Sequence, residues 1–197
     1  MEIDCSIVQV FSKNPVPGAV KTRLVPVLGA KGACKLQENM LEILLDEVAK
    51  LDKPAEIWTD SRVVHPLITK SGFPHQIQKG RDVGEKMLFA IADGLIRADR
   101  IVLVGSDLPP LDSYYIDSAI KALDEHDVVF GPTEDGGFGL IATKVFCIDM
   151  FNGVKWSSNS VLREILRNLS EVSFRCHCLP AIWDVDTPND LWRLFQI

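Results

Sequence analysis

One carboxylate follows an apolar run that could be buried on both faces. The segment 101–107, Ile-Val-Leu-Val-Gly-Ser-Asp, is typical of a strand inside a parallel sheet. Pro109 and Pro110 then prevent this strand from continuing. Because ligands of open α/β sheets bind outside the carboxyl ends of the strands, Asp107 is expected at the edge of a site. The alternative is that Asp107 only forms a turn or caps the next helix.

A basic loop at residues 12–24 is the second candidate. Pro15, Pro17 and Gly18 exclude a regular helix or strand here. Its cations are Lys13, Lys21 and Arg23. They could hold phosphate groups, because arginine makes bidentate contacts and lysine neutralises charge. The alternative is a solvated charged loop. The sequence contains neither a Walker loop nor a Rossmann glycine fingerprint.

Three more polar segments follow expected strands. Asp82 could cap the next helix, or it could contact a base or ribose. The glycines Gly136, Gly137 and Gly139 either let the backbone approach a ligand closely or form a tight turn into the next strand. Asp184 and Asp186 lie on one face if their segment is extended, although Asp186 could simply begin a terminal helix.

Composition excludes several classes of protein. At 197 residues, 47% of them hydrophobic, the chain fits one globular domain over 1–197 with a substantial core. A net charge of −6 argues against general affinity for nucleic acid or an anionic membrane. No apolar stretch reaches the roughly 20 residues of a membrane span and no signal peptide is evident, so a cytoplasmic location is expected. Five cysteines without C-x-x-C spacing predict reduced thiols.

The elements that must position these candidates alternate along the chain. Apolar runs predict strands at 5–11, 55–58, 76–78, 101–107, 127–130, 140–143 and 174–179. Helical spacing of apolar residues predicts helices at 31–50, 63–71, 87–95, 113–123 and 161–169, and a terminal helix from Pro188. Ser113 is a plausible N-cap. This alternation predicts a three-layer α/β/α sandwich with a mostly parallel sheet.

Five segments occur in an order that resembles a known family. They are the loop 13–24, the turn 82–87, Gly105-Ser-Asp-Leu-Pro109, Asp135-Gly-Gly137 and Asp184-Val-Asp-Thr-Pro188. This order is similar to that of glycosyltransferase-like nucleotide-diphospho-sugar transferases, and the match spans almost the whole chain. The resemblance implies a compact GT-A fold, similar in layout to the molybdenum-cofactor and phospholactate nucleotidyltransferases.

The resemblance also implies roles for individual residues. Asp107, Lys21 and Arg23 would be catalytic. The implied nucleotide-binding residues are Lys13, Pro17, Gly18, Lys21, Arg23, Asp82, Gly84 and Ser106. Asp107 would bind Mg²⁺ or Mn²⁺ with Asp184 or Asp186, and carboxylates with phosphate oxygens and waters are the ligands that these ions prefer. The implied acceptor-side residues are Asp135, Gly136, Gly137 and Trp156.

These features support three hypotheses about function. The favoured one is a metal-dependent transferase that moves a sugar from a nucleotide-activated donor to a small-molecule acceptor. The second is a nucleotidyltransferase that joins an NTP to a phosphorylated acceptor and releases pyrophosphate, with the same residues. The third is a nucleotide-binding protein without turnover. The expected partners are therefore a nucleotide or nucleotide-sugar and a small molecule.

Overall fold

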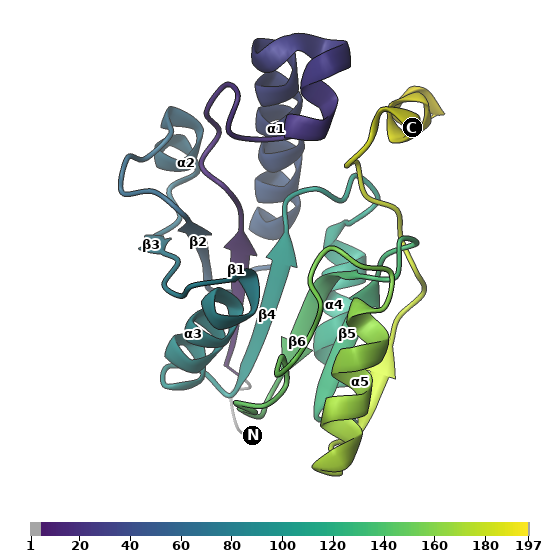
Figure 1. Ribbon diagram of the computed structural model, residues 1–197. Coiled ribbons are helices and arrows are strands. Elements are labelled where there is room, and N and C mark those ends of the chain that lie inside the picture. Colours follow the sequence, from purple (N-terminus) through teal and green to yellow (C-terminus); the bar gives the residue numbers. More distant parts are fainter. Residues whose placement is uncertain (1–4, 197) are drawn as a thin grey trace.

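The computed structural model describes residues 5–196, and its centre is a mixed sheet (Figure 1). The strands of this part are β1 (Ser6–Phe11), β2 (Ala55–Thr59), β3 (His75–Ile77), β4 (Arg100–Gly105), β5 (Val128–Pro132), β6 (Phe138–Thr143) and β7 (Cys176–Cys178). They lie in the order β3-β2-β1-β4-β6-β5-β7. All neighbours are parallel except that β6 runs antiparallel to both β4 and β5. The prediction of a mostly parallel sheet is confirmed.

The antiparallel strand has a local cause. Only residues 133–137 separate β5 from β6, and a connection this short can join only antiparallel neighbours. The parallel strands, in contrast, are connected through helices. The hairpin turn therefore comes to the same edge of the sheet as the carboxyl ends of β1 and β4, where polar loops gather.

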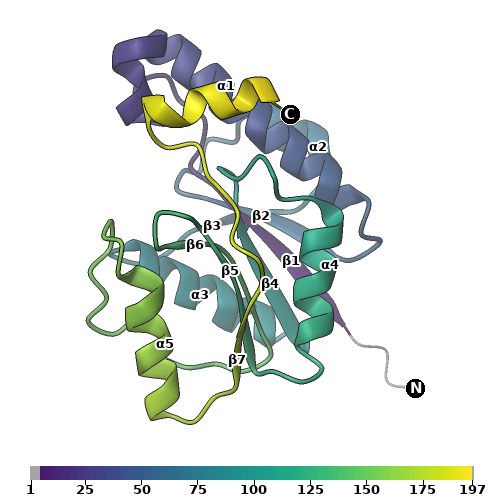
Figure 2. The same cartoon turned by 90° about the vertical axis from the view of Figure 1, so that its right-hand side faces the viewer.

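Helices cover both faces of the sheet (Figure 2). They are α1 (Val25–Ala49), α2 (Pro66–Ser71), α3 (Val83–Leu95), α4 (Ser113–Ala122) and α5 (Val161–Glu171), with the 3-10 helices η1 (Thr22–Leu24) and η2 (Pro188–Gln196). Side chains of α1, α2 and α4 pack against one face, and those of α3 and α5 pack against the other. The chain is thus the three-layer sandwich that the alternation predicted.

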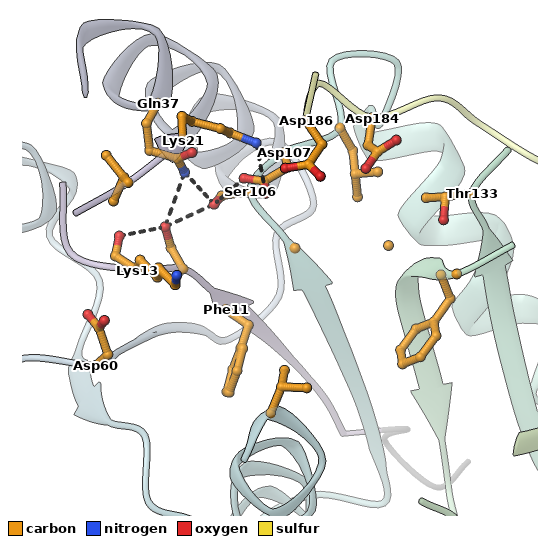
Figure 3. A pocket seen from close by; sticks show the side chains of 18 of the residues that line it. Phe11, Lys13, Lys21, Gln37, Asp60, Ser106, Asp107, Thr133, Asp184 and Asp186 are labelled. Carbon is orange, nitrogen blue, oxygen red and sulfur yellow. Dashed lines mark hydrogen bonds and ion pairs between the residues drawn. The ribbon is translucent and has the colours of Figure 1, made fainter. Parts of the chain in front are cut away.

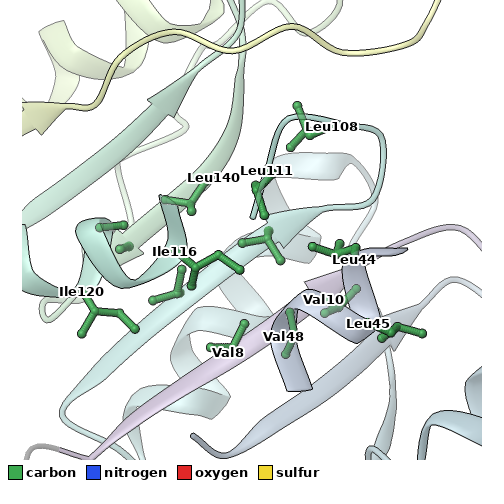
Figure 4. Close-up of a cluster of buried hydrophobic side chains, with 14 of the residues drawn as sticks. Val8, Val10, Leu44, Leu45, Val48, Leu108, Leu111, Ile116, Ile120 and Leu140 are labelled. Atoms are coloured by element: carbon green, nitrogen blue, oxygen red, sulfur yellow. The ribbon is translucent and has the colours of Figure 1, made fainter. Parts of the chain in front are cut away.

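The core explains why β4 is apolar on both faces. Val102 and Val104 point toward α1 and α4, while Ile101 and Leu103 point toward α3, and all four are buried. Figure 4 shows the first of these clusters, in which Leu44 and Val48 of α1 meet the sheet and α4. Burial of this much apolar surface fixes the position of the residues that follow β4.

Three local expectations need correction or refinement. Asp112, not Ser113, caps α4, because its carboxylate accepts a 2.8 Å hydrogen bond from the backbone N–H of Tyr115. The terminal element from Pro188 is a 3-10 helix rather than an α-helix. The helix expected from residue 31 begins earlier, at Val25, but Gly29 interrupts it with a positive φ of 68°. Within residues 5–196, no helix combines the length and apolarity that a membrane span needs.

Candidate active site

A cavity of about 470 Å³ lies at the carboxyl edge of the sheet (Figure 3). Its walls come from the ends of β1 and β4, the basic loop, the start of α3, the β5–β6 turn and the segment 184–186. A cavity of this size accommodates a small ligand such as a nucleotide. The edge position follows from the sheet, because parallel strands end together and their following loops converge there.

A buried hydrogen-bond network forms the floor of this cavity. Gln37 of α1 donates to the hydroxyl of Ser106 at 2.8 Å, and Ser106 donates to that of Ser12 at 2.9 Å. All three side chains are buried. The network ties the ends of β1 and β4 to α1, so Ser106 has a positioning role beside its predicted contact with nucleotide. Sequence reasoning missed Gln37, although an amide between Ala33 and Met40 on an apolar helix face is a detectable signal.

The basic loop contacts the strand-end carboxylate directly. The ammonium of Lys21 lies 2.9 Å from Oδ2 of Asp107 and donates to the carbonyl of Val185 at 2.5 Å. The side chain of Lys21 is only 3% exposed, whereas that of Asp107 is 46% exposed. Lys21 has a left-handed backbone conformation, with φ 48°. Val185 also donates its N–H to the carbonyl of Asp107 at 3.0 Å. These contacts connect the basic loop, the segment after β4 and the segment 184–186.

A second ion pair joins the same segments nearer to solvent. The guanidinium of Arg23 contacts the carboxylate of Asp186, and both side chains are largely exposed. Asp190 holds this segment from the other side by accepting from the backbone N–H groups of Asp186 and Thr187. Exposed ion pairs contribute little to the free energy of unfolding, so the pair of Arg23 and Asp186 stabilises the fold only weakly. Both side chains are therefore available to a ligand.

Two further carboxylates lie on the hairpin side of the cavity. The pKa of Asp184 is raised to about 6, mainly by burial and then by the nearby charges of Asp135 and Asp186. Asp135 itself accepts hydrogen bonds from the hydroxyl of Thr133 at 2.5 Å and from the N–H of Gly137 at 3.0 Å. Asp135 therefore shapes the β5–β6 turn, while the raised pKa means that Asp184 takes up a proton at a higher pH than an ordinary aspartate does.

The wall opposite Asp186 contains the start of α3. Asp82 caps this helix by accepting from the N–H of Glu85 at 2.9 Å, so the capping alternative is confirmed. Asp82 also lines the cavity, with Lys86 and Asp60. Asp60 follows β2 as Asp107 follows β4, and this shared position is the signal that could have identified it.

Five of the predicted site residues do not line the cavity: Pro17, Gly18, Gly84, Gly136 and Trp156. Gly84 and Trp156 pack on each other, since a Cβ on Gly84 would lie 2.6 Å from the indole ring. A Cβ on Gly136 would lie 2.2 Å from the carbonyl oxygen of Asn159. Gly84, Gly136 and Trp156 thus pack the walls from outside, and their contact with a ligand stays a prediction. The remaining predicted residues all line the cavity.

The donor set suits a hard divalent ion only in part. Asp107, Asp184 and Asp186 offer the carboxylate oxygens that Mg²⁺ and Mn²⁺ prefer, and all three line one cavity. Within residues 5–196, however, no three such side chains converge tightly enough to hold a metal ion alone. Lys21 and Arg23 contact two of the carboxylates instead. A metal ion in this cavity would therefore need oxygens from a bound phosphate to complete its coordination shell.

The fold matches that of known proteins over nearly the whole chain. A family model described as "Uncharacterized protein conserved in bacteria (DUF2064)" matches residues 45–158. The chain is also similar to a protein provisionally named a nucleotide-diphospho-sugar transferase, from Desulfovibrio desulfuricans G20. That crystal structure superposes with a TM-score of 0.87 at 30% identity, covering 96% of this chain and 87% of the other.

Two more distant similarities also cover most of the chain. A curated relative, 2-phospho-L-lactate guanylyltransferase of Methanocaldococcus vulcanius, is 22% identical over 96% of this chain and 84% of its own length. Glucosyl-3-phosphoglycerate synthase from Mycobacterium tuberculosis, solved with Mg²⁺ and UDP, is 11% identical. It gives a TM-score of 0.61 over 96% of this chain and 74% of that protein. The expected GT-A-like fold is confirmed.

Proposed function

The chain belongs to the family described as "Uncharacterized protein conserved in bacteria (DUF2064)", and we propose that it is a cytoplasmic transferase that uses a nucleotide-diphospho-sugar with Mg²⁺ or Mn²⁺. One observation carries this proposal: Lys21 and Arg23 meet Asp107 and Asp186 in one cavity at the carboxyl edge of the sheet. Phosphate-binding cations and metal-binding carboxylates are thus side by side, as transfer from a diphosphate requires.

The cations of the cavity bind and neutralise the diphosphate. Arg23 offers a planar pair of donors, while Lys13 and Lys21 offer point charges. Asp107, with Asp184 or Asp186, would hold the metal ion, which supplies stabilisation of the charge on the departing nucleoside diphosphate. Lys21 and Arg23 contribute to the same stabilisation, because charge that develops in the transition state lies against groups already in place.

The charge of the cavity favours a diphosphate over a triphosphate. Six carboxylates and four cations line it, an excess of two negative charges: Asp60, Asp82, Asp107, Asp135, Asp184 and Asp186 against Lys13, Lys21, Arg23 and Lys86. One divalent ion balances that excess. The diphosphate diester of a nucleotide-sugar then adds about two negative charges, whereas the triphosphate of an NTP adds about four, with stronger repulsion from the same walls.

The two ends of the cavity take different parts of the reactants. Asp82, at the start of α3, faces the nucleoside, and Asp60 and Lys86 lie on the same side. Asp135 and Gly137 face the acceptor, because they belong to the β5–β6 turn on the opposite side of Asp107. Gly84, Gly136 and Trp156 support these walls from outside. Pro17 and Gly18 shape the loop that carries Lys21 and Arg23.

A nucleotidyltransferase is the second candidate. The similarity to a phospholactate guanylyltransferase over 96% of the chain favours it, and the same residues would serve the reaction. The products distinguish the two reactions. Sugar transfer releases a nucleoside diphosphate, while nucleotidyl transfer releases pyrophosphate.

The test begins with binding and ends with products. Nucleotide-sugars and NTPs are screened by thermal shift with and without Mg²⁺, because a ligand that binds only the folded state raises Tm by mass action. We expect a nucleotide-sugar to give the largest Mg²⁺-dependent shift. The best ligand is then incubated with small acceptors, and nucleoside diphosphate and pyrophosphate are assayed separately. Absence of any Mg²⁺-dependent shift would overturn the proposal.

A further inference from the structure

Lys21 occupies the position from which a cation would approach Asp107. Its ammonium lies 2.9 Å from Oδ2, and the other oxygen, Oδ1, lies 3.3 Å from the hydroxyl of Ser106. Oδ2 of Asp107 is therefore held by Lys21, while Oδ1 competes with Ser12 for the single proton of the Ser106 hydroxyl. Figure 3 shows the Lys21 side chain crossing toward Asp107, with Asp186 and Asp184 beside it.

Lys21 cannot easily turn away into solvent. Its side chain is 3% exposed, its ammonium also donates to the carbonyl of Val185, and its backbone is fixed in the left-handed region at φ 48°. By comparison Lys13, in the same loop and the same cavity, is exposed. A divalent ion that approaches Asp107 before any nucleotide binds must therefore come close to a buried positive charge, and the two repel.

A bound diphosphate reverses this effect. Its oxygens accept hydrogen bonds from an ammonium and also coordinate Mg²⁺ or Mn²⁺, so they screen the two cations from each other. An ammonium has three donors, of which Asp107 and Val185 use two, and the third is available to phosphate. Binding of phosphate to Lys21 also weakens its hold on Asp107.

We infer that Lys21 couples the binding of metal and nucleotide: its ammonium serves as a built-in cation at Asp107 and excludes the metal ion until a diphosphate binds. This inference rests on the proposed function and names the residue that regulates the site. Arg23 plays no equivalent part, because its pair with Asp186 is largely exposed and is screened by water. The coupling is reciprocal, so the metal must strengthen nucleotide binding by the same factor.

Titration of Mn²⁺, followed by electron paramagnetic resonance, tests the coupling. The probe is whichever of UDP, GDP, CDP and ADP gives the largest thermal shift. We expect wild type to bind Mn²⁺ at least about tenfold more weakly alone than with that nucleotide. We expect Lys21→Met to bind Mn²⁺ alone at least about tenfold more tightly than wild type, and to lose most of the coupling. Lys35→Met, at an exposed lysine of α1 outside the cavity, is the control and should leave Mn²⁺ binding in the absence of nucleotide unchanged.

The outcomes separate this inference from the proposed function. Equal Mn²⁺ affinity of wild type with and without nucleotide would overturn the proposed function together with the inference, because the coupling is reciprocal. An unchanged Mn²⁺ affinity of folded Lys21→Met would overturn the inference alone. Lys21→Arg keeps the charge and should keep the weak binding of Mn²⁺ alone. If none of the nucleotides raises Tm with or without metal, the proposed function itself fails.

Discussion

Two of the regions in which a carboxylate lies against a cation differ in how many hydrogen bonds the carboxylate accepts. Glu56 in β2 is 2% exposed and accepts from Arg97, from the indole N–H of Trp58 and from the amide of Gln9, all within 3.0 Å. Burial alone would raise the pKa of Glu56, but these hydrogen bonds outweigh it and lower the pKa. Glu56 is thus closed to solvent and accepts four hydrogen bonds, although the Arg97 side chain is 41% exposed.

In the ion pair of Lys21 and Asp107 at the cavity, the carboxylate is the exposed partner. Asp107 is 46% exposed, and the cation, Lys21, is the buried partner. Asp184 and Asp186 line the same cavity as Asp107. A buried carboxylate that accepts several hydrogen bonds stabilises the fold. An exposed carboxylate beside a buried cation can instead exchange partners with a ligand.

The largest expected effect comes from breaking the ion pair between Glu56 and Arg97. Arg97→Met leaves a buried carboxylate with two neutral donors, and it should lower the free energy of unfolding by about 3 kcal/mol. Urea denaturation measures this loss. The double variant Glu56→Gln/Arg97→Met removes both charges and should be more stable than Arg97→Met alone. Nucleotide affinity should stay at the wild-type value in both variants. If Arg97→Met is as stable as wild type, the contrast between the two regions is wrong.

Asp107→Asn should give the second effect, on binding rather than on folding. The substitution keeps the size of the side chain but removes the charge that a hard cation selects, so Mg²⁺-dependent nucleotide affinity should fall about a hundredfold, close to 3 kcal/mol. Calorimetric titration with and without Mg²⁺ measures it. Asp46→Asn, an exposed change of the same charge on α1, is the control. Surviving metal dependence would return Asp107 to the role of a turn former.

The contrast also separates what the sequence could and could not predict. Strand-end position and residue type were enough to predict that Asp107, Lys21, Arg23 and Asp186 belong to one edge of the sheet, and the structure brings them into one cavity. The direct contact between Lys21 and Asp107 could not be predicted. It depends on a left-handed residue in an irregular loop and on packing between segments far apart in the chain.

Packing roles were the least predictable. A glycine in a helix start reads equally well as a ligand contact or as room for a neighbour, and Gly84 proves to pack against Trp156. The same holds for Gly139, where a Cβ would lie 2.2 Å from Leu108. The antiparallel direction of β6 was implied only by one alternative, the tight turn at Gly136 and Gly137, because the alternation of strands and helices by itself predicts parallel neighbours.

Arg23→Ala tests how far exposure weakens a pair in the cavity. The Arg23 side chain is 62% exposed, so the free energy of unfolding should change by less than about 1 kcal/mol. Nucleotide binding should weaken by about 1–3 kcal/mol, the scale of a charge-assisted hydrogen bond to phosphate. Lys35→Ala breaks an exposed pair on α1 and should change neither quantity. Unchanged nucleotide affinity in Arg23→Ala would identify the loop as merely solvated.

The smallest effect should come from Asp184, and it depends on pH. The pKa of its carboxyl is raised to about 6 by burial and by Asp135 and Asp186, with Lys21 opposing the shift. Below its ordinary value of 3.8 the group is protonated in the folded and unfolded states alike, so it costs no stability. As pH rises from 3.8 to about 6 the unfolded chain ionises first, and the folded state loses stability until both are ionised.

Asp184→Asn should therefore match wild type in Tm near pH 3.8 and exceed it by a few degrees above pH 7 in the absence of metal. Mg²⁺ with nucleotide should narrow this gap, because a bound cation favours the ionised carboxylate of the wild type. Differential scanning calorimetry across this pH range measures both terms, and a Tm difference that is constant with pH would show that the Asp184 carboxyl titrates normally.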